Sequence, residues 1–357
     1  MQPRLQVIPF VIDASGASEQ VSTFSSVSTS NEKNQLKMTA KRYTLDDSGE
    51  NVHGLTLLFA HCIGAHKEQW EPIIERIFLT QSDKDQPHHR IREAWAFDWQ
   101  NHGDAGVLNR ELLEDRPEGV SIYEWASAIT AFVRSPRMKG HRIVPLGHSA
   151  GAGAVMLTTK SFALSSLPYV SLILIEPTMV TQELFFKHFD DRMDQMNFTV
   201  EATLMRRDTW PSREEAFRYL SKRFPWSMWE PRVVKLLVTY GLQDIPGSDR
   251  VTLKCDKKQE AVSYPDVDGH FEAPLELGRV SRVLPVHIVW GTNNDLVPEF
   301  IQDSLCDTTQ GKHVASVSRV EDAGHMVVQE KPDDLAMIIC EILNRISPGR
   351  CTVQSRL

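Results

Sequence analysis

Residues 147–151 form the sequence Gly-His-Ser-Ala-Gly, and this short stretch constrains the fold more than any other part of the chain. An apolar run ending at Leu146 precedes it, and a run of small residues from Ala152 to Ala154 follows it. This order predicts a strand, a tight turn and a helix, with the Ser149 hydroxyl exposed at the turn. The flanking glycines leave the space that such a crossing needs. We therefore interpret Ser149 as a catalytic nucleophile rather than a serine in an ordinary glycine-rich turn.

A serine hydroxyl becomes nucleophilic only when a base lies within hydrogen-bond reach. The chain has 13 histidines, and most suit surface or structural roles. His325 differs because it lies in an Ala-Gly-His loop that follows the last expected strand. This position fits the chain order of nucleophile, acid and base that such elbows require. We therefore predict that His325 is the general base.

Two carboxylates could orient the imidazole of His325. Glu176 lies at the end of the strand that follows the elbow, and Asp295 lies in a loop after a later strand. In that loop the usual position of the acid falls on Asn294, which carries no charge. A carboxylate at the end of a central strand faces the crevice where such sheets bind ligands. We favour Glu176 for this reason and keep Asp295 as the alternative acid.

Attack on an acyl carbon produces an oxyanion that two preorganised N–H groups must stabilise. The first predicted donor is the amide of Ala150, directly after the nucleophile. The second is expected in the loop after the apolar run 55–60, where Ile63 is the best candidate. The two residues before Ile63 are His-Cys, where His-Gly is usual. We expect the charge of Lys67, further along this loop, to be solvated.

Apolar runs and helical patterns alternate along most of the chain, which predicts an α/β fold with a mostly parallel sheet flanked by helices. Helical signals follow one another between residues 178 and 280 and interrupt this alternation. We expect residues 178–280 to form an inserted helical lid, and residues 1–177 and 281–357 to form the core. The expected strands of the core are 5–13, 37–45, 55–60, 93–98, 142–146, 171–175, 286–290 and 314–320.

The composition excludes several classes of function. The formal net charge is −8 and no basic stripe is visible, so we expect no nucleic-acid partner. No run approaches the roughly 18 apolar residues that span a bilayer, so we expect no membrane span. The five cysteines show no Cys-x-x-Cys pair, which argues against a metal site and a disulfide framework. Serine chemistry needs no cofactor, and we expect none.

The chain ends in Ser355-Arg356-Leu357, which matches the small, basic, leucine pattern of a peroxisomal address. A Pro-Gly pair at 348–349 and a polar tail precede it, so a receptor could reach it. We therefore expect a peroxisomal protein whose partner is the import receptor.

The Gly-His-Ser-Ala-Gly and Ala-Gly-His motifs, together with the helical insertion, resemble the α/β-hydrolase superfamily over roughly residues 36–346. Four segments are more narrowly similar to fungal hydrolases of secondary-metabolite clusters, of the mycophenolic-acid acyl-CoA hydrolase and host-selective-toxin types. These segments are FAHCIGAHKEQWEP (59–72), LIEPTM (174–179), LLVTYGL (236–242) and VTLKC (251–255) followed by Glu260. The resemblance implies peroxisomal thioester hydrolysis, with the acid after the strand that follows the elbow. Glu176 matches this position, although an aspartate would be expected there.

These observations predict a serine hydrolase that cleaves the acyl-CoA thioester of a bulky hydrophobic acid through an acyl-enzyme on Ser149. One alternative is a carboxylesterase or lactonase that uses the same residues, because serine chemistry does not separate esters from thioesters. Another is a non-hydrolytic binding or cyclase scaffold. An epoxide hydrolase is disfavoured because it would need a carboxylate at position 149.

Overall fold

The computed structural model describes residues 5–13, 19–21, 35–45, 51–81 and 91–346. Within these ranges a sheet has the strand order β12-β11-β7-β6-β4-β5-β3-β1-β2. The strands from β12 to β5 run parallel, and β3, β1 and β2 add an antiparallel edge. Their bounds are β1 (Gln6–Asp13), β2 (Glu19–Val21), β3 (Lys37–Thr44), β4 (Leu55–Ala60), β5 (Ile91–Phe97), β6 (Arg142–His148), β7 (Leu172–Ile175), β11 (Val286–Gly291) and β12 (Ser316–Val320). The predicted α/β fold with a mostly parallel sheet is confirmed.

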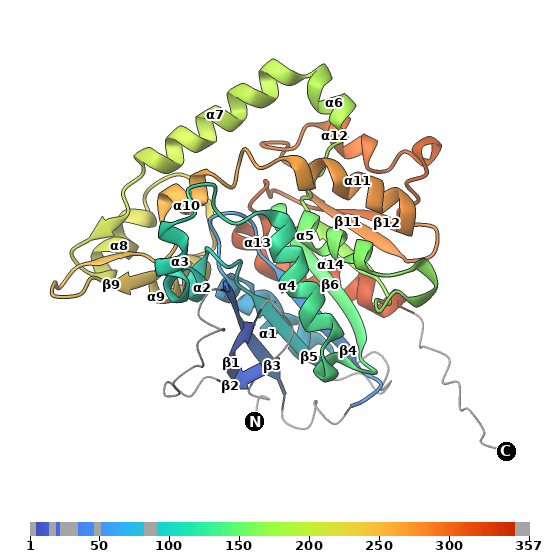
Figure 1. The fold of residues 1–357 in the computed structure, drawn as a ribbon, viewed down its shortest axis with the longest axis horizontal. Helices are drawn as coiled ribbons and strands as arrows, with labels where there is room; N and C mark the ends of the chain where they lie inside the picture. The colour runs from blue at the N-terminus through green and yellow to red at the C-terminus, as the bar shows by residue number, and fades with distance from the viewer. Residues whose placement is uncertain (1–4, 14–18, 22–34, 46–50, 82–90, 347–357) are drawn as a thin grey trace.

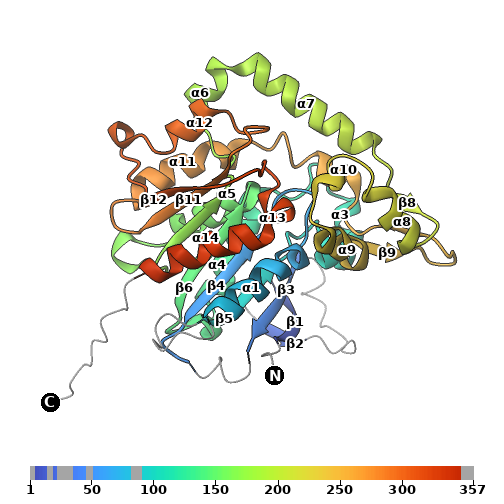
Figure 2. The same cartoon turned by 180° about the vertical axis from the view of Figure 1, so that it is seen from behind.

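Helices cover both faces of this sheet (Figures 1 and 2). One face carries α4 (Ile122–Arg134), α5 (Ala150–Thr158) and α11 (Asp268–Val280), and the other carries α1 (Glu71–Gln81) and α14 (Pro332–Arg345). Shorter helices lie in the connections: α2 (Gly103–Leu108), α3 (Arg110–Glu114), α12 (Glu299–Ser304) and α13 (Val327–Glu330).

The sequence of β4 explains why the sheet is buried on both faces. All six residues of this strand are buried, and successive side chains point to opposite faces. Leu58 packs into the core beside α4 and α5, whereas Leu57 and Phe59 pack into the core beside α1 and α14. Neighbouring parallel strands share this pattern, so the carboxyl ends of β4, β6 and β7 meet at one edge of the sheet.

Residues between β7 and α11 lie beside and above the sheet, and the part from β8 to β10 has its own hydrophobic core around Trp210, Leu220 and Val234 (Figure 1). The long helix α7 passes over the top of the molecule, and Thr203 is its one buried residue. The elements are α6 (Gln182–Lys187), α7 (Phe189–Met205), β8 (Thr209–Trp210), α8 (Arg213–Leu220), α9 (Pro231–Tyr240), β9 (Leu242–Asp244), β10 (Val251–Leu253) and α10 (Lys257–Ala261).

The range 178–280 is not purely helical, which corrects one expectation. Strands β8, β10 and β9 form a small antiparallel sheet there. Strands of two or three residues are too short to show a period-two pattern in the sequence. Helix α11 lies in the same range, yet its side chains pack on α5 in the main core. The division into a core and a lid therefore stays a prediction.

No helix in the described part of the chain combines the length and apolar character needed to cross a bilayer. The C-terminal Ser355-Arg356-Leu357 lies outside the described residues.

Candidate active site

Ser149 stands between strand β6 and helix α5. Its φ of 56° and ψ of −117° are rare for a residue with a side chain, and such a conformation costs on the order of 1–3 kcal/mol. A Cβ on Gly147 would lie 2.2 Å from the Gly151 carbonyl oxygen, and one on Gly151 would lie 2.4 Å from that of Ala60. Only glycine fits at these two positions, so the glycines of the motif allow the turn that holds Ser149.

The His325 imidazole and the Glu176 carboxylate meet at the carboxyl edge of the sheet, where Nδ1 lies 3.2 Å from Oε2. Both side chains are buried. Glu176 follows β7 with a φ of 46°, and its Oε1 accepts the Gly291 N–H at 2.6 Å. When Nδ1–H is donated to the carboxylate, Nε2 keeps the lone pair that a general base needs. The contact between Glu176 and His325 therefore has the geometry expected of a carboxylate that orients a histidine base.

The same imidazole lies beside the elbow. The rings of His325 and His148 have centroids 5.3 Å apart, and His148 directly precedes Ser149. The His148 Nε2–H donates to the His325 carbonyl oxygen at 2.7 Å. Among the described residues no hydrogen bond joins the Ser149 hydroxyl to His325, and such contacts often tighten only when substrate binds. The structure thus brings the predicted nucleophile, base and acid to one place.

Asp295, the alternative acid, contacts the backbone of His325 instead of its ring. Its Oδ1 accepts the His325 N–H at 2.8 Å. Glu330 accepts the N–H of Gly324, the preceding residue, at 2.7 Å. Burial, together with the nearby carboxylates, raises the pKa of Glu330. These two carboxylates therefore fix the loop from which the imidazole projects, and the geometry favours Glu176 as its acid partner.

One predicted oxyanion donor belongs to the elbow and the other to the loop after β4, whose His61 carbonyl oxygen would lie 2.6 Å from a Cβ on Gly151. Ala150 is the first residue of α5, and Ile63 lies in the loop after β4. Neither amide donates a hydrogen bond to another residue in the described part of the chain, so both are available to an oxyanion. Burial raises the pKa of the neighbouring Cys62 thiol to about 12, which disfavours the thiolate that a cysteine nucleophile needs.

Lys67 is buried, and the expectation of a solvated charge was wrong. Its Nζ contacts Asp98 at 2.7 Å, Glu68 at 3.0 Å and Asp104 at 2.5 Å, and the side chain is 1% exposed. Burial opposes its charge, but the carboxylates outweigh this effect and raise the pKa of Lys67. Lys67 therefore ties the loop after β4 to the loop after β5 and does not face substrate.

Buried neutral histidines make the stability of the fold sensitive to acid. Burial lowers the pKa of His148 to about 3 and that of His270 to about 4, whereas an unfolded histidine titrates near about 6.5. Between these values the unfolded chain binds more protons, so each histidine lowers the free energy of unfolding by about 1.4 kcal/mol per pH unit as the pH falls.

We therefore expect the free energy of unfolding in urea to fall steeply from about pH 6.5 to about pH 5. His270→Gln, which cannot take up this proton, should show a shallower fall than the unmodified chain. An unfolding free energy that stays constant over this range would contradict the prediction.

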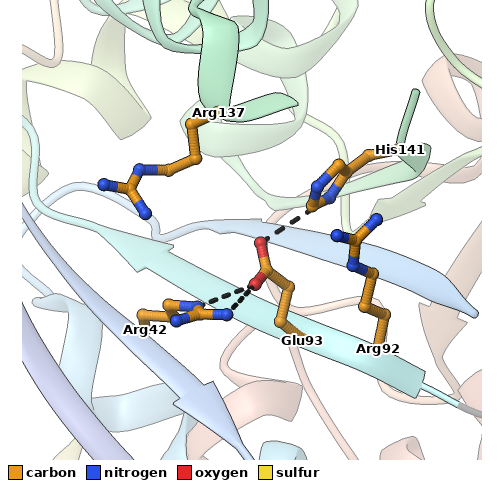
Figure 3. Close-up of a pocket in the computed structure, with 5 residues that line it drawn as sticks. All are labelled: Arg42, Arg92, Glu93, Arg137 and His141. Atoms are coloured by element: carbon orange, nitrogen blue, oxygen red, sulfur yellow. Dashed lines mark hydrogen bonds and ion pairs between the residues drawn. The ribbon is translucent and has the colours of Figure 1, made fainter. Parts of the chain in front are cut away.

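A cavity of about 360 Å³ lies away from Ser149, at the opposite edge of the sheet (Figure 3). It is lined by Arg42 of β3, by Arg92 and Glu93 at the amino end of β5, and by Arg137 and His141 in the connection between α4 and β6. Glu93 lies at its centre and pairs with Arg42 at 2.6 Å. Because Ser149 follows the carboxyl end of β6, this cavity is not where an acyl group would meet the nucleophile.

The sheet, the elbow and the histidine loop define an α/β-hydrolase architecture. A sequence profile described as "Alpha/beta hydrolase family" matches residues 57–338. The chain belongs to this family.

Two curated fungal proteins are similar to the chain. The type I acyl-CoA thioesterase mpaH of Penicillium roqueforti is 25% identical over 294 residues, covering 80% of this chain and 59% of that protein. The mpaH of Penicillium brevicompactum is 26% identical over 278 residues, covering 77% of this chain and 57% of that protein. The predicted resemblance to fungal acyl-CoA hydrolases is confirmed, although the chain spans less than two thirds of these relatives.

Solved structures show the same fold. The peroxisomal alpha-beta-hydrolase Lpx1 of Saccharomyces cerevisiae superimposes with a TM-score of 0.71 at 18% identity, covering 100% of this chain and 94% of that one. The thioesterase domain from the curacin biosynthetic pathway has a TM-score of 0.58 at 14% identity, covering 85% of this chain and 95% of that domain.

Proposed function

We propose that the chain is a serine hydrolase that cleaves the acyl-CoA thioester of a bulky hydrophobic acid. The observation that carries the hydrolase proposal is the elbow at Ser149 beside a buried His325 whose Nδ1 lies 3.2 Å from Glu176. The thioester is proposed because the chain is similar to proteins named acyl-CoA thioesterases.

In the proposed acylation step, the Ser149 oxygen attacks the thioester carbonyl carbon while its proton passes to Nε2 of His325. Glu176 stabilises the imidazolium that forms. The carbonyl oxygen becomes an oxyanion and accepts hydrogen bonds from the amides of Ala150 and Ile63. The carbon–sulfur bond then breaks, and the leaving thiolate takes the proton from His325.

In the proposed deacylation step, water attacks the acyl-Ser149 ester and gives its proton to the same imidazole. The oxyanion is stabilised again, the bond to Ser149 breaks, and the serine oxygen recovers the proton from His325. The products are free acid and coenzyme A. One base thus serves both halves of the reaction, as in other acyl-enzyme mechanisms.

Apolar side chains for the acyl group are available in α6, α7 and α11. Phe185, Phe186, Phe189 and Phe271 form a cluster with ring centroids 5.1–6.3 Å apart. Phe186 is 55% exposed and Phe189 is 42% exposed, so part of this aromatic surface can still be covered. We propose that it contacts the bulky acyl group.

A substrate panel tests the thioester assignment. CoA thioesters of several acids, each paired with an oxygen ester of the same acid, should show higher kcat/KM for the thioester. A fluorophosphonate probe should label Ser149, as mass spectrometry of the digested protein would show. Preference for the oxygen ester would assign the chain to the carboxylesterases or lactonases. An unlabelled Ser149 and an inactive chain would favour the non-hydrolytic scaffold.

We also propose that the chain acts in peroxisomes, through recognition of Ser355-Arg356-Leu357 by the import receptor. The fold likeness to a hydrolase named peroxisomal is compatible with this proposal. A fluorescent protein fused to the N-terminus should colocalise with a peroxisomal marker, and removal of the last three residues should abolish this. Unchanged localisation of the truncated chain would refute the proposal.

A further inference from the structure

Two buried histidines connect the loop after β4 to the loop after β5 in a reciprocal way. His61, from the first loop, accepts the N–H of Trp99 in the second at 3.1 Å through Nε2. His102, from the second loop, accepts the N–H of Gly64 in the first at 3.0 Å, also through Nε2. The ring centroids lie 5.3 Å apart. Each loop thus supplies a ring that binds the backbone of the other.

These contacts define the protonation of both rings. A backbone N–H can only donate, so Nε2 of each ring must carry a lone pair. The proton is then on Nδ1, which donates to the Cys62 carbonyl oxygen at 2.7 Å in His61 and to the Asn101 side-chain oxygen at 2.7 Å in His102. All four ring nitrogens are satisfied in the neutral form. Burial favours the same form, lowering the pKa of His61 to about 4 and that of His102 well below its usual value.

The hydrogen bond from His61 to the Cys62 carbonyl oxygen determines the direction of the Ile63 N–H. The Cys62 oxygen accepts from His61 Nδ1–H and from the Ala65 N–H at 3.2 Å. In a planar trans peptide, the C=O and the N–H point in opposite directions. Fixing the Cys62 oxygen therefore fixes the direction of the Ile63 N–H. On the other side of Ile63, His102 holds the next amide, that of Gly64.

Residues between β7 and α11 support the His102 side of this arrangement. Asn101 donates through its side chain to the Gln259 carbonyl oxygen at 3.3 Å. Gly64 has a φ of +77°, and a Cβ there would lie 2.7 Å from Oε1 of Glu260. Glu260 is buried and ion-paired with Arg206. A side chain at position 64 would therefore collide with the buried Glu260, which limits the conformations open to this turn.

We infer that His61 and His102 are positioning residues for the oxyanion hole, which hold the peptide that presents the Ile63 N–H to substrate. This inference rests on the proposed hydrolase function. If the Cys62–Ile63 peptide turned over, a carbonyl oxygen would replace the N–H and would repel the oxyanion. In this inference neither histidine contacts the substrate.

Replacing each histidine with asparagine and with glutamine separates the two ring nitrogens. The asparagine amide can take the place of Nδ1, and the glutamine amide can take the place of Nε2. At position 61 the contact that orients Ile63 is made by Nδ1, so His61→Asn should keep more activity than His61→Gln. At position 102 the contact to Gly64 is made by Nε2, so His102→Gln should keep more activity than His102→Asn.

The less active variant at each position should lower kcat about 10- to 100-fold, with KM changed less than about threefold. Removal of one oxyanion-hole donor lowers kcat by about 10²- to 10³-fold, and a misdirected donor should cause a loss of kcat up to this size. His270→Gln is the matched control, since His270 is also buried with a lowered pKa but contacts Thr178 instead. Its kcat should stay within about twofold of the unmodified chain. Thermal unfolding and fluorophosphonate labelling rates should be measured for every variant.

The inference is supported if the asparagine variant is the more active one at position 61 and the glutamine variant is the more active one at position 102. The same order at both positions, or losses that follow the melting temperature, would indicate a purely structural role and overturn it. Folded variants with unchanged kcat would also overturn it. If one variant fails to fold, the pair at the other position decides. An unmodified chain that neither hydrolyses esters or thioesters nor reacts with the probe would instead refute the proposed function.

Discussion

Ser149→Ala should lower kcat for thioester hydrolysis by about 10⁴- to 10⁶-fold, because no acyl-enzyme can form without the serine oxygen. The oxyanion donors and the binding surface remain, so KM should change little and a small residual rate should persist. Steady-state release of coenzyme A, followed with a thiol reagent, gives both parameters. The same variant should lose fluorophosphonate labelling. A variant that keeps full activity would remove Ser149 from the mechanism.

The backbone at Ser149 supplies a matched control. Its φ of 56° is strained for alanine as it is for serine, but glycine adopts this region readily. Ser149→Gly should therefore be as inactive as Ser149→Ala but more stable to unfolding than it, by about 1 kcal/mol. Equal stability of the two variants would show that the elbow stores no strain at this position.

Glu176→Gln should lower kcat by about 10³- to 10⁴-fold with KM little changed. Oε1 of Glu176 accepts the Gly291 N–H, so the glutamine oxygen must take this place and its NH₂ must face the imidazole. Nδ1 of His325 would then have to accept, which leaves the proton on Nε2 and removes the base. The glutamine also cannot stabilise the imidazolium. Steady-state kinetics at saturating substrate measure the loss.

Asp295→Asn is the control for this experiment. Asp295 accepts the backbone N–H of His325 at 2.8 Å, and an asparagine oxygen can do the same. We expect a loss of less than about tenfold. If Asp295→Asn were the more damaging change, the role of the acid would pass from Glu176 to Asp295.

Much of the fold could be predicted because its signals are local. The apolar run Leu55–Ala60 indicates a strand buried on both faces, and this is the observed β4. Ser121 and Glu124 have capping-box spacing, and both hydrogen bonds of the box are present at the start of α4. Gly147 and Gly151 indicate a crossing that no side chain could enter. Each of these signals is contained within a few neighbouring residues.

The rest depends on contacts between distant segments. Lys67 looks like a surface charge until Asp98 and Asp104 approach it from another loop. Glu176 and Asp295 are both acids near strand ends, and the sequence does not show that one meets the His325 ring and the other its backbone. The paired role of His61 and His102 has no sequence signal of its own, because their partners are backbone amides.

The bond from Glu176 to the Gly291 amide has an evolutionary consequence. Gly291 ends β11, the neighbour of β7, so this carboxylate joins two strand ends as well as facing the imidazole. A lineage that moved its acid to position 295 would have to free Asp295 from the His325 backbone and also provide a new acceptor for Gly291. A change at position 176 alone loses the acceptor for Gly291, and a change at position 295 alone does not supply an acid for the imidazole. Exchange between the two acid positions therefore requires several simultaneous changes, which tends to keep the acid where it is.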